Sequence, residues 1–465
     1  MAGSLATRIA AEHAAAAASL PGDVVSSERR RSAIAALAAE GLPTTRDENW
    51  KYANLRPLEK VRFSPRVGVG GASPSVTPAD LPTAIEGYAR YVFVDGVFSA
   101  SLSSAVGKTG ITVTSLHDSR ANAAAPVRPA DAAATDRVGE TVTSKDARFA
   151  LLNDAFATDG ASIRVAAGTD CPTCIELVFV AQVESQTASS YPRVELHVEA
   201  DARVGLIERH VSVGTGTNFV NASVRVDIAR SATVNHYLLQ ESGAKAVWFN
   251  TLSAVLAQDA VYKLHSVNVG GLSARSTINV QLAGDRADAS VSMASLGDRQ
   301  QIQDAFVLVE HVAPNAHSTQ TFRGISAGRA RVAFNGMVVV RKDAHGTDSQ
   351  QSLRGLLAGP DAEIDVRPQL EIYTDDVRCA HGATAGKLDD NMLFYLLSRG
   401  IDAATAQRLL KWAFLEDVVA KIEVPELRRQ IEHKLAGQMQ EADALKGPPY
   451  TVDGELHEQF PRELR

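Results

Sequence analysis

From about residue 160 to residue 377, short runs of Val, Ile, Leu, Thr and Phe alternate with polar residues. This period of two predicts β-strands, and small-residue turns separate them. Steps of 30, 28, 27 and 29, and then of 14, 14 and 18 residues, separate the turn alanines 202, 232, 260, 287, 316, 330, 344 and 362. The near-constant step favours stacked coils, as in a β-helix. A large antiparallel sandwich is the alternative that the pattern leaves open.

The regions before this repeat have different patterns. Residues 26–40 predict a surface helix with Ser26 or Ser27 as its cap and Gly41 as its stop. Residues 46–60 place Trp50 and Tyr52 among charged residues, so we expect their rings to dock on another domain. Residues 91–99 predict a hairpin, because the central Asp-Gly pair tolerates the positive φ of a tight turn.

After the repeat, residues 387–440 change to a helical period. Asp389 and Asp402 are expected to cap two helices, and Gly400 is expected to end the first of them. Pro425 suits the first turn of a third helix. A compact helical domain therefore follows a long β domain.

Composition and charge narrow the function. With 45% hydrophobic and 22% charged residues, the 465-residue chain has the composition of a soluble globular protein. Its net charge of −7 gives no basic excess for nucleic acid, and no apolar run reaches the length of a membrane span. Three cysteines are too few and too unevenly placed for a disulfide framework, which favours a reducing, cytoplasmic setting.

The stretch 368–386 is the most informative for chemistry. If it is extended, Cys379 and His381 lie on one face of a strand, about 6.6 to 7 Å apart. A thiolate and an imidazole at that spacing can share a soft or borderline metal. From spacing alone, a buried cysteine and a hydrogen-bonded histidine at a domain junction are the favoured alternative.

Other candidate sites are weaker. Cys171 and Cys174 have the spacing of a redox or zinc pair, but without further ligands we interpret them as ordinary turn cysteines. His311 and His317 flank a Pro-Asn turn and are interpreted as part of a surface loop. Residues 107–109 resemble the end of a phosphate loop, but Leu102 replaces its first glycine, so no ATP site is expected. No self-sufficient active site is visible.

Two longer motifs resemble a known family. QLEIYTDDVRCAHGATAG at 369–386, followed by LFYLLSRGID at 393–402, is similar to the signature of the SufD branch of the SufB/SufD family, which acts in the SUF iron-sulfur cluster assembly system. RDENWKYANL at 46–55 and ARFALLNDAFATDGASIRV at 147–165 support the resemblance, which extends from about residue 43 to residue 435.

The resemblance implies a fold and a division of the chain. The expected fold is mainly β, a right-handed parallel β-helix flanked by N-terminal and C-terminal helical regions. We expect an N-terminal helical region, a mixed loop-rich segment with a hairpin, a β-helix core, a C-terminal helical domain and a tail, at residues 1–62, 63–150, 151–386, 387–445 and 446–465.

The resemblance also implies partners and a role. By this resemblance, the chain is expected to be a noncatalytic scaffold subunit that pairs with the paralogue SufB through the β-helix and binds the ATPase SufC through residues 387–440. A transient iron-sulfur cluster shared with the partner subunit forms at the junction, where Cys379 and His381 are the matching ligand positions and His381 is the stronger candidate. Without partners, a homodimer is the expected substitute. The alternative function is a freestanding metal-binding enzyme that uses the same two residues.

The number of possible ligands independently supports the interpretation as a scaffold subunit. A conventional cluster takes four cysteine thiolates, with histidine as an occasional substitute. Cys379 lies 205 residues beyond the nearest other cysteine, so the chain offers at most two local ligands, Cys379 and His381, unless folding brings the cysteines together. The missing ligands are expected to come from another subunit.

Overall fold

The computed structural model describes residues 2–65, 76–104, 106–117, 146–182 and 188–439. The expected tail at 446–465, residues 440–445 of the expected helical domain, and residues 66–75, 105 and 118–145 of the expected loop-rich segment lie outside the described residues.

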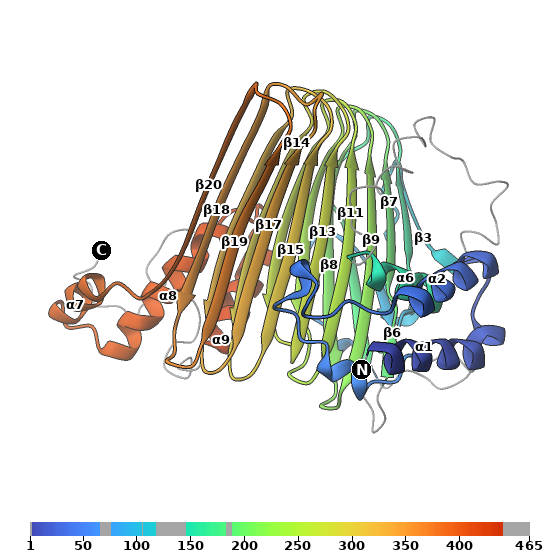
Figure 1. The fold of residues 1–465 in the computed structure, drawn as a ribbon, viewed down its shortest axis with the longest axis horizontal. Helices are drawn as coiled ribbons and strands as arrows, with labels where there is room; N and C mark the ends of the chain where they lie inside the picture. The colour runs from blue at the N-terminus through green and yellow to red at the C-terminus, as the bar shows by residue number, and fades with distance from the viewer. Residues whose placement is uncertain (1, 66–75, 105, 118–145, 183–187, 440–465) are drawn as a thin grey trace.

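The centre of the molecule is a solenoid of two long sheets (Figure 1). The first sheet contains, in spatial order, β2 (Val97–Phe98), β1 (Ala89–Val94), β5 (Asp170–Gln182), β8 (Arg203–Val213), β10 (Thr233–Glu241), β12 (Val261–Val269), β14 (Asp288–Gly297), β16 (His317–Ser326), β18 (Thr347–Leu357) and β20 (Val377–Lys387). The second contains β19 (Glu363–Ile372), β17 (Arg331–Val340), β15 (Ile302–His311), β13 (Ser273–Leu282), β11 (Val247–Leu256), β9 (Asn218–Ile228), β7 (Arg193–Val198), β4 (Ala161–Val165) and β3 (Ile111–Ser115), with β6 (Ala188–Ser190) beside β9.

The strands of the solenoid pair in parallel. From β8 onward, successive strands alternate between the two sheets, and from β9 onward each pairs with the strand two places earlier in the chain. Their inward side chains, such as Val204 and Leu206 of β8, form one continuous apolar core. The predicted parallel β-helix with flanking helices is therefore confirmed, and the antiparallel sandwich is wrong. Among the described strands, antiparallel pairing is confined to β1 with β2 and β3 with β4.

The turn alanines mark the corners of the coils. The first seven are buried, and Ala362, in the last of these turns, is half-buried. The residue before each of the first five has a positive φ of 56–60°, at positions Asp201, Ser231, Asp259, Arg286 and Asn315. The backbone N–H of each of these five residues donates to a carbonyl in the next coil, which offsets the cost of the left-handed conformation. The long steps thus span one full coil, and the steps of 14, 14 and 18 residues span half coils that alternate between the two sheets.

The predicted hairpin closes the N-terminal end of the first sheet. Phe93 pairs with Phe98, and Asp95 and Gly96 have φ values of 50° and 82° between the strands. Strand β1 then pairs in parallel with β5, so the hairpin continues the sheet.

N-terminal helices cover the outer face of the second sheet (Figure 1). They are α1 (Ala2–Ala16), α2 (Ser27–Glu40) and α6 (Arg148–Phe156), with short 3-10 turns at η1 (Ala17–Ser19), η2 (Glu48–Trp50) and η3 (Arg56–Glu59). Two further 3-10 turns, η4 (Pro78–Asp80) and η5 (Ala100–Leu102), lie beside β1 and β5 of the first sheet, where Leu81 and Leu102 pack. As predicted, Ser26 caps α2 and Gly41 ends it with a φ of 72°. Trp50 stacks on Phe149 and lies near Phe249 of β11, which confirms the predicted docking for this ring. Tyr52 is half-buried, and its ring contacts the neighbouring Lys51.

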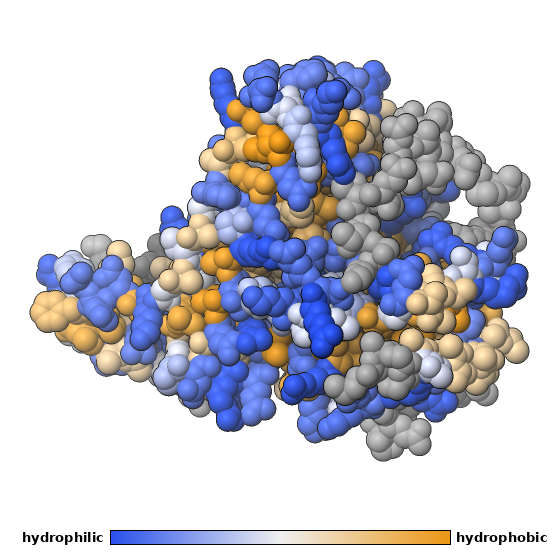
Figure 2. Space-filling model, viewed as in Figure 1, coloured by the Kyte–Doolittle hydropathy of each residue, from blue (hydrophilic) through white to orange (hydrophobic). Residues whose placement is uncertain are grey.

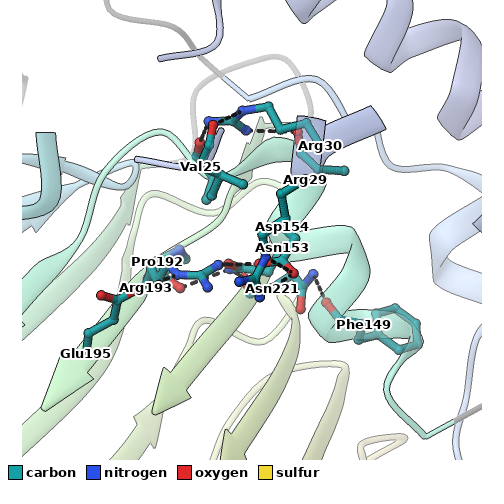
Figure 3. Close-up of polar contacts among 12 residues, drawn as sticks. Val25, Arg29, Arg30, Phe149, Asn153, Asp154, Pro192, Arg193, Glu195 and Asn221 are labelled. Atoms are coloured by element: carbon teal, nitrogen blue, oxygen red, sulfur yellow. Dashed lines mark hydrogen bonds and ion pairs between the residues drawn. The ribbon is translucent and has the colours of Figure 1, made fainter. Parts of the chain in front are cut away.

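Polar contacts fix α6 between α2 and the solenoid (Figure 3). Asp154 on α6 accepts hydrogen bonds from Arg29 at 2.9 Å and from Arg193 of β7 at 2.6 Å. The Asn153 side chain donates to the Asn221 carbonyl on β9 at 2.8 Å, and the Asn221 side chain donates to the Phe149 carbonyl at 2.8 Å. Because Asn153 and Asn221 are fully buried, these bonds set the position of α6 as well as its stability.

Three helices follow the solenoid at the C-terminal end, and two of them cover the outer face of the first sheet. They are α7 (Asp390–Ser398), α8 (Ala403–Val419) and α9 (Pro425–Gln438). Asp389 and Asp402 cap α7 and α8, Gly400 follows α7 with a φ of 85°, and Pro425 opens α9, all as predicted. Helices α8 and α9 bury apolar side chains against the first sheet, whereas α7 has no buried residue and extends away from the solenoid (Figure 1). No helix in the described part of the chain is long and apolar enough to cross a bilayer.

Glu416 makes this helical domain sensitive to pH. Burial, followed by the like charge of Glu432 on α9, raises the pKa of Glu416 from 4.5 to about 7, and one of its carboxylate oxygens has no hydrogen-bond partner. Below pH 4.5 the folded and unfolded chains both hold this proton. Between pH 4.5 and 7 only the folded chain keeps it, so the stability from Glu416 is lost as the pH rises through this window.

We expect Glu416→Gln to remove this pH dependence. Because Glu416 is only half-buried, the variant should gain about 1–2 kcal/mol over the original chain at pH 8. The gain should disappear below pH 4.5, where both chains are neutral at this position. Thermal unfolding at both pH values measures the difference, and an equal effect at the two values would contradict the assignment.

Candidate functional site

Strand β20 forms an open edge at the C-terminal end of the solenoid. It pairs with β18 on one side, and no strand of the described residues pairs with its other side. The second sheet ends beside it at β19. Backbone N–H and C=O groups along the outer edge of such a strand are available to another chain.

Cys379 and His381 both lie on β20, two residues apart, as the sequence predicts. In register, Cys379 is opposite Ser349 and His381 is opposite Gln351 on β18. Cys379 is half-buried against a small apolar cluster that includes Val338 and Val340 of β17, whereas His381 is exposed. The alternation of a strand places both side chains on the same face.

The surroundings of Cys379 favour a neutral thiol. Burial raises the pKa of this thiol, the negative charge of Asp348 raises it further, and the backbone N–H of Ser349 partly opposes them. Metals bind the thiolate, so binding here must release a proton. The free chain therefore keeps Cys379 protonated and weakly reactive at neutral pH.

The interpretation of His311 as part of a surface loop is wrong. His311 ends β15 with its side chain fully buried, and its Nε2 contacts the Ser318 hydroxyl at 2.8 Å. The Ser318 hydroxyl lies 2.9 Å from that of Ser349, the residue opposite Cys379. Burial, with a smaller contribution from His317, lowers the pKa of His311 to about 4, so its ring is neutral. His317 remains near the surface beside Asp288. The sequence did not reveal the burial of His311, because this residue belongs to the end of β15 and the Pro-Asn turn begins only after it.

The interpretation of Cys171 and Cys174 as turn cysteines is also wrong. Both belong to strand β5, where the register with β8 shifts between Cys171 and Ile175, and a disulfide joins them. A bulge accommodates the extra residues within the strand. Strand β5 is seven strand spacings from β20 in the first sheet, which corresponds to ~34 Å. Folding therefore does not bring this pair to Cys379.

The chain supplies few metal ligands at the edge. Within the described ranges, no three His, Cys, Asp or Glu residues are grouped so that they could hold a metal ion. Asp375 and Asp376, which precede the strand, are exposed. Cys379 and His381 thus remain the two local candidates.

Two cavities differ in their relation to this edge. A cavity of about 230 Å³ lies beside β16, β18 and β20 and includes Gln351 and His381 in its lining. A larger one of about 1010 Å³ lies between turns of the coils and the end of α9, and contains neither Cys379 nor His381. The larger cavity is therefore not the one that contains a candidate ligand.

Comparison with known proteins gives the family. A family model described as SUF system FeS cluster assembly, SufBD core domain, matches residues 179–414. A second model, for the SufBD protein N-terminal region, matches residues 18–177. The chain belongs to the SufBD family. SufBD proteins of the SUF system act in iron-sulfur cluster assembly, and the resemblance seen in the sequence is confirmed.

Individual SufBD relatives are similar over most of the chain. The iron-sulfur cluster assembly protein SufD of Escherichia coli is 30% identical over 85% of this chain and 89% of its own length. A SufBD family protein of Synechocystis is 27% identical over 88% of this chain and 90% of its own. The chloroplastic protein ABCI7 of Arabidopsis thaliana is 28% identical over 65% of this chain and 66% of its own.

Proposed function

We propose that this chain is a noncatalytic, cytoplasmic scaffold subunit on which a nascent iron-sulfur cluster is assembled. The observation that carries the proposal is the position of Cys379 and His381 on the last strand of an open β-helix. Two ligands at an open edge leave room for ligands from a second subunit. A cluster held by so few ligands from one chain is bound weakly, which suits a cargo that must be released.

The partner at this edge is proposed to be the SufB paralogue. The open edges of β19 and β20 offer backbone groups for strand pairing. At the end of β19, Ile372 and Tyr373 are 40% and 56% exposed, which supplies apolar contact area next to the edge. A second copy of this chain is the substitute partner when the paralogue is absent.

The ATPase SufC is proposed to bind the C-terminal helical domain, within residues 387–440. Helix α7 exposes Met392, Phe394 and Tyr395 by 59%, 72% and 53%. Figure 2 shows the corresponding apolar surface at the end of the molecule where α7 lies. Large exposed apolar residues gathered on one element are typical of a protein interface. The chain itself is proposed to hold no ATP.

Phe394→Asp tests this docking, and through it the scaffold function. We expect the tagged variant to recover about 10-fold less ATPase from the native host than the original chain, because loss of an interface aromatic costs ~2 kcal/mol or more. Folding should be unaffected, since Phe394 is 72% exposed. Quantitative mass spectrometry of the recovered complex is the measurement.

Asn391→Asp is the matched control, because it adds the same charge at an exposed polar position of the same helix. It should retain the ATPase. Equal recovery with both variants would contradict the docking assignment. Recovery of the original chain alone with one tightly bound metal would instead favour the freestanding enzyme. Deletion of the whole domain is a poorer test, because α8 and α9 cover the apolar outer face of the first sheet.

A further inference from the structure

We propose that Gln351 is a positioning residue for His381. Its side-chain carbonyl accepts a hydrogen bond from one ring nitrogen of His381, so that the other nitrogen offers its lone pair to the nascent cluster. The inference deepens the proposed function and rests on His381 being a ligand.

Gln351 lies between a second glutamine and His381. On β18 it is in register with Gln320 of β16 on one side and with His381 of β20 on the other. Gln320 and Gln351 face the interior of the solenoid and are 1% and 4% exposed. The three side chains therefore form one row across three neighbouring strands.

A backbone carbonyl sets the direction of both amides. The Gln320 Nε2 donates to the carbonyl of Met337 at 3.3 Å, and a carbonyl can only accept. The Gln320 Oε1 must then face Gln351, where it accepts from the Gln351 Nε2 at 3.2 Å. This leaves the Gln351 Oε1 as an acceptor, and it is buried without a hydrogen-bond partner among the described residues. An unpaired buried carbonyl is costly, so a donor is expected there.

Gly336 reserves the space for the two amides. A Cβ atom at this position of β17 would lie 2.4 Å from the Gln320 Oε1 and 3.0 Å from the Gln351 Nε2. Any larger residue would displace the pair. The opposite sheet is therefore shaped around these two glutamines.

His381 is the donor in register with this acceptor. Strand β20 is the neighbour of β18 on the side away from Gln320. A neutral imidazole has one N–H donor and one acceptor nitrogen, so a bond to Gln351 fixes which nitrogen can bind metal. Metal-ligating histidines commonly donate their second nitrogen to a fixed acceptor, which orients the ring. Gln351 supplies such an acceptor from the interior of the fold.

The test uses Gln351→Met, which fills similar space without an acceptor, and Gln351→Glu, which restores one. Ring ¹⁵N signals of the ¹⁵N-histidine-labelled chain report the tautomer, and His381→Ala identifies the His381 signals. We expect one dominant tautomer in the original chain and in Gln351→Glu, and a mixture in Gln351→Met. In the complex with its partners, Gln351→Met should lower cluster yield about 10-fold.

Gln350→Leu is the control, because Gln350 is exposed on the opposite face of the same strand. It should change neither tautomer nor yield. A tautomer mixture for His381 in the original chain would overturn the inference without any variant, as would an unchanged tautomer and yield in Gln351→Met. Unchanged yield in His381→Ala would instead overturn the proposed role of His381, which separates the two failures.

Discussion

Replacing His381 with alanine is expected to lower cluster yield in the assembled complex by about 10-fold or more, since loss of a partner that merely orients a ligand already costs that much. The variant should fold normally and bind its partners, because the His381 side chain is exposed. Iron and acid-labile sulfide per complex, measured after anaerobic assembly, give the yield.

His345→Ala provides the matched control for this result. His345 is also exposed and lies in the turn before β18. Its removal should leave the yield unchanged. If His345→Ala and His381→Ala gave the same yield as the original complex, His381 would not be a ligand.

Replacing Trp50 with alanine is expected to reduce the free energy of unfolding by about 3–5 kcal/mol, the usual cost of removing a large core aromatic. Trp50 is 1% exposed and stacks on Phe149 at 5.2 Å between ring centroids. The guanidinium of Arg275 lies 4.4 Å from its ring centre, and its indole N–H donates to Asp146 at 2.9 Å. These contacts join the N-terminal region to the solenoid, to α6 and to Asp146 just before α6.

Urea denaturation measures this loss, with Tyr52→Ala as the control. Tyr52 is half-buried, and its ring contact is with the neighbouring Lys51. Its removal should cost clearly less. Equal losses for Trp50 and Tyr52 would mean that Trp50 does not anchor the N-terminal region to the solenoid.

Local chemistry made much of the fold predictable. The caps at Ser26, Asp389 and Asp402 and the turn at Asp95-Gly96 depend on a few neighbouring residues, and the structure has them as expected. The alanine spacing favoured stacked coils because one residue type recurs where successive coils turn. Pattern alone could not exclude a sandwich, since period-two strands serve both architectures.

The candidate site was predictable only in part. The two-residue spacing placed Cys379 and His381 on one face, because a strand requires it. The position of β20 at the edge of the sheet depends on how all the strands are arranged. The local pattern of residues carries no information about that arrangement. The row of Gln320 and Gln351, and the room that Gly336 leaves for it, involve three strands of two successive coils and had no signal in any single segment.

The most direct measurement of the central claim is the iron and acid-labile sulfide that the purified chain retains after anaerobic reconstitution and desalting. We predict little or none for the chain by itself, and a stable cluster once the SufB paralogue is added, because Cys379 and His381 fill only part of a coordination shell. A full complement of iron and sulfide held by the monomer would contradict the claim.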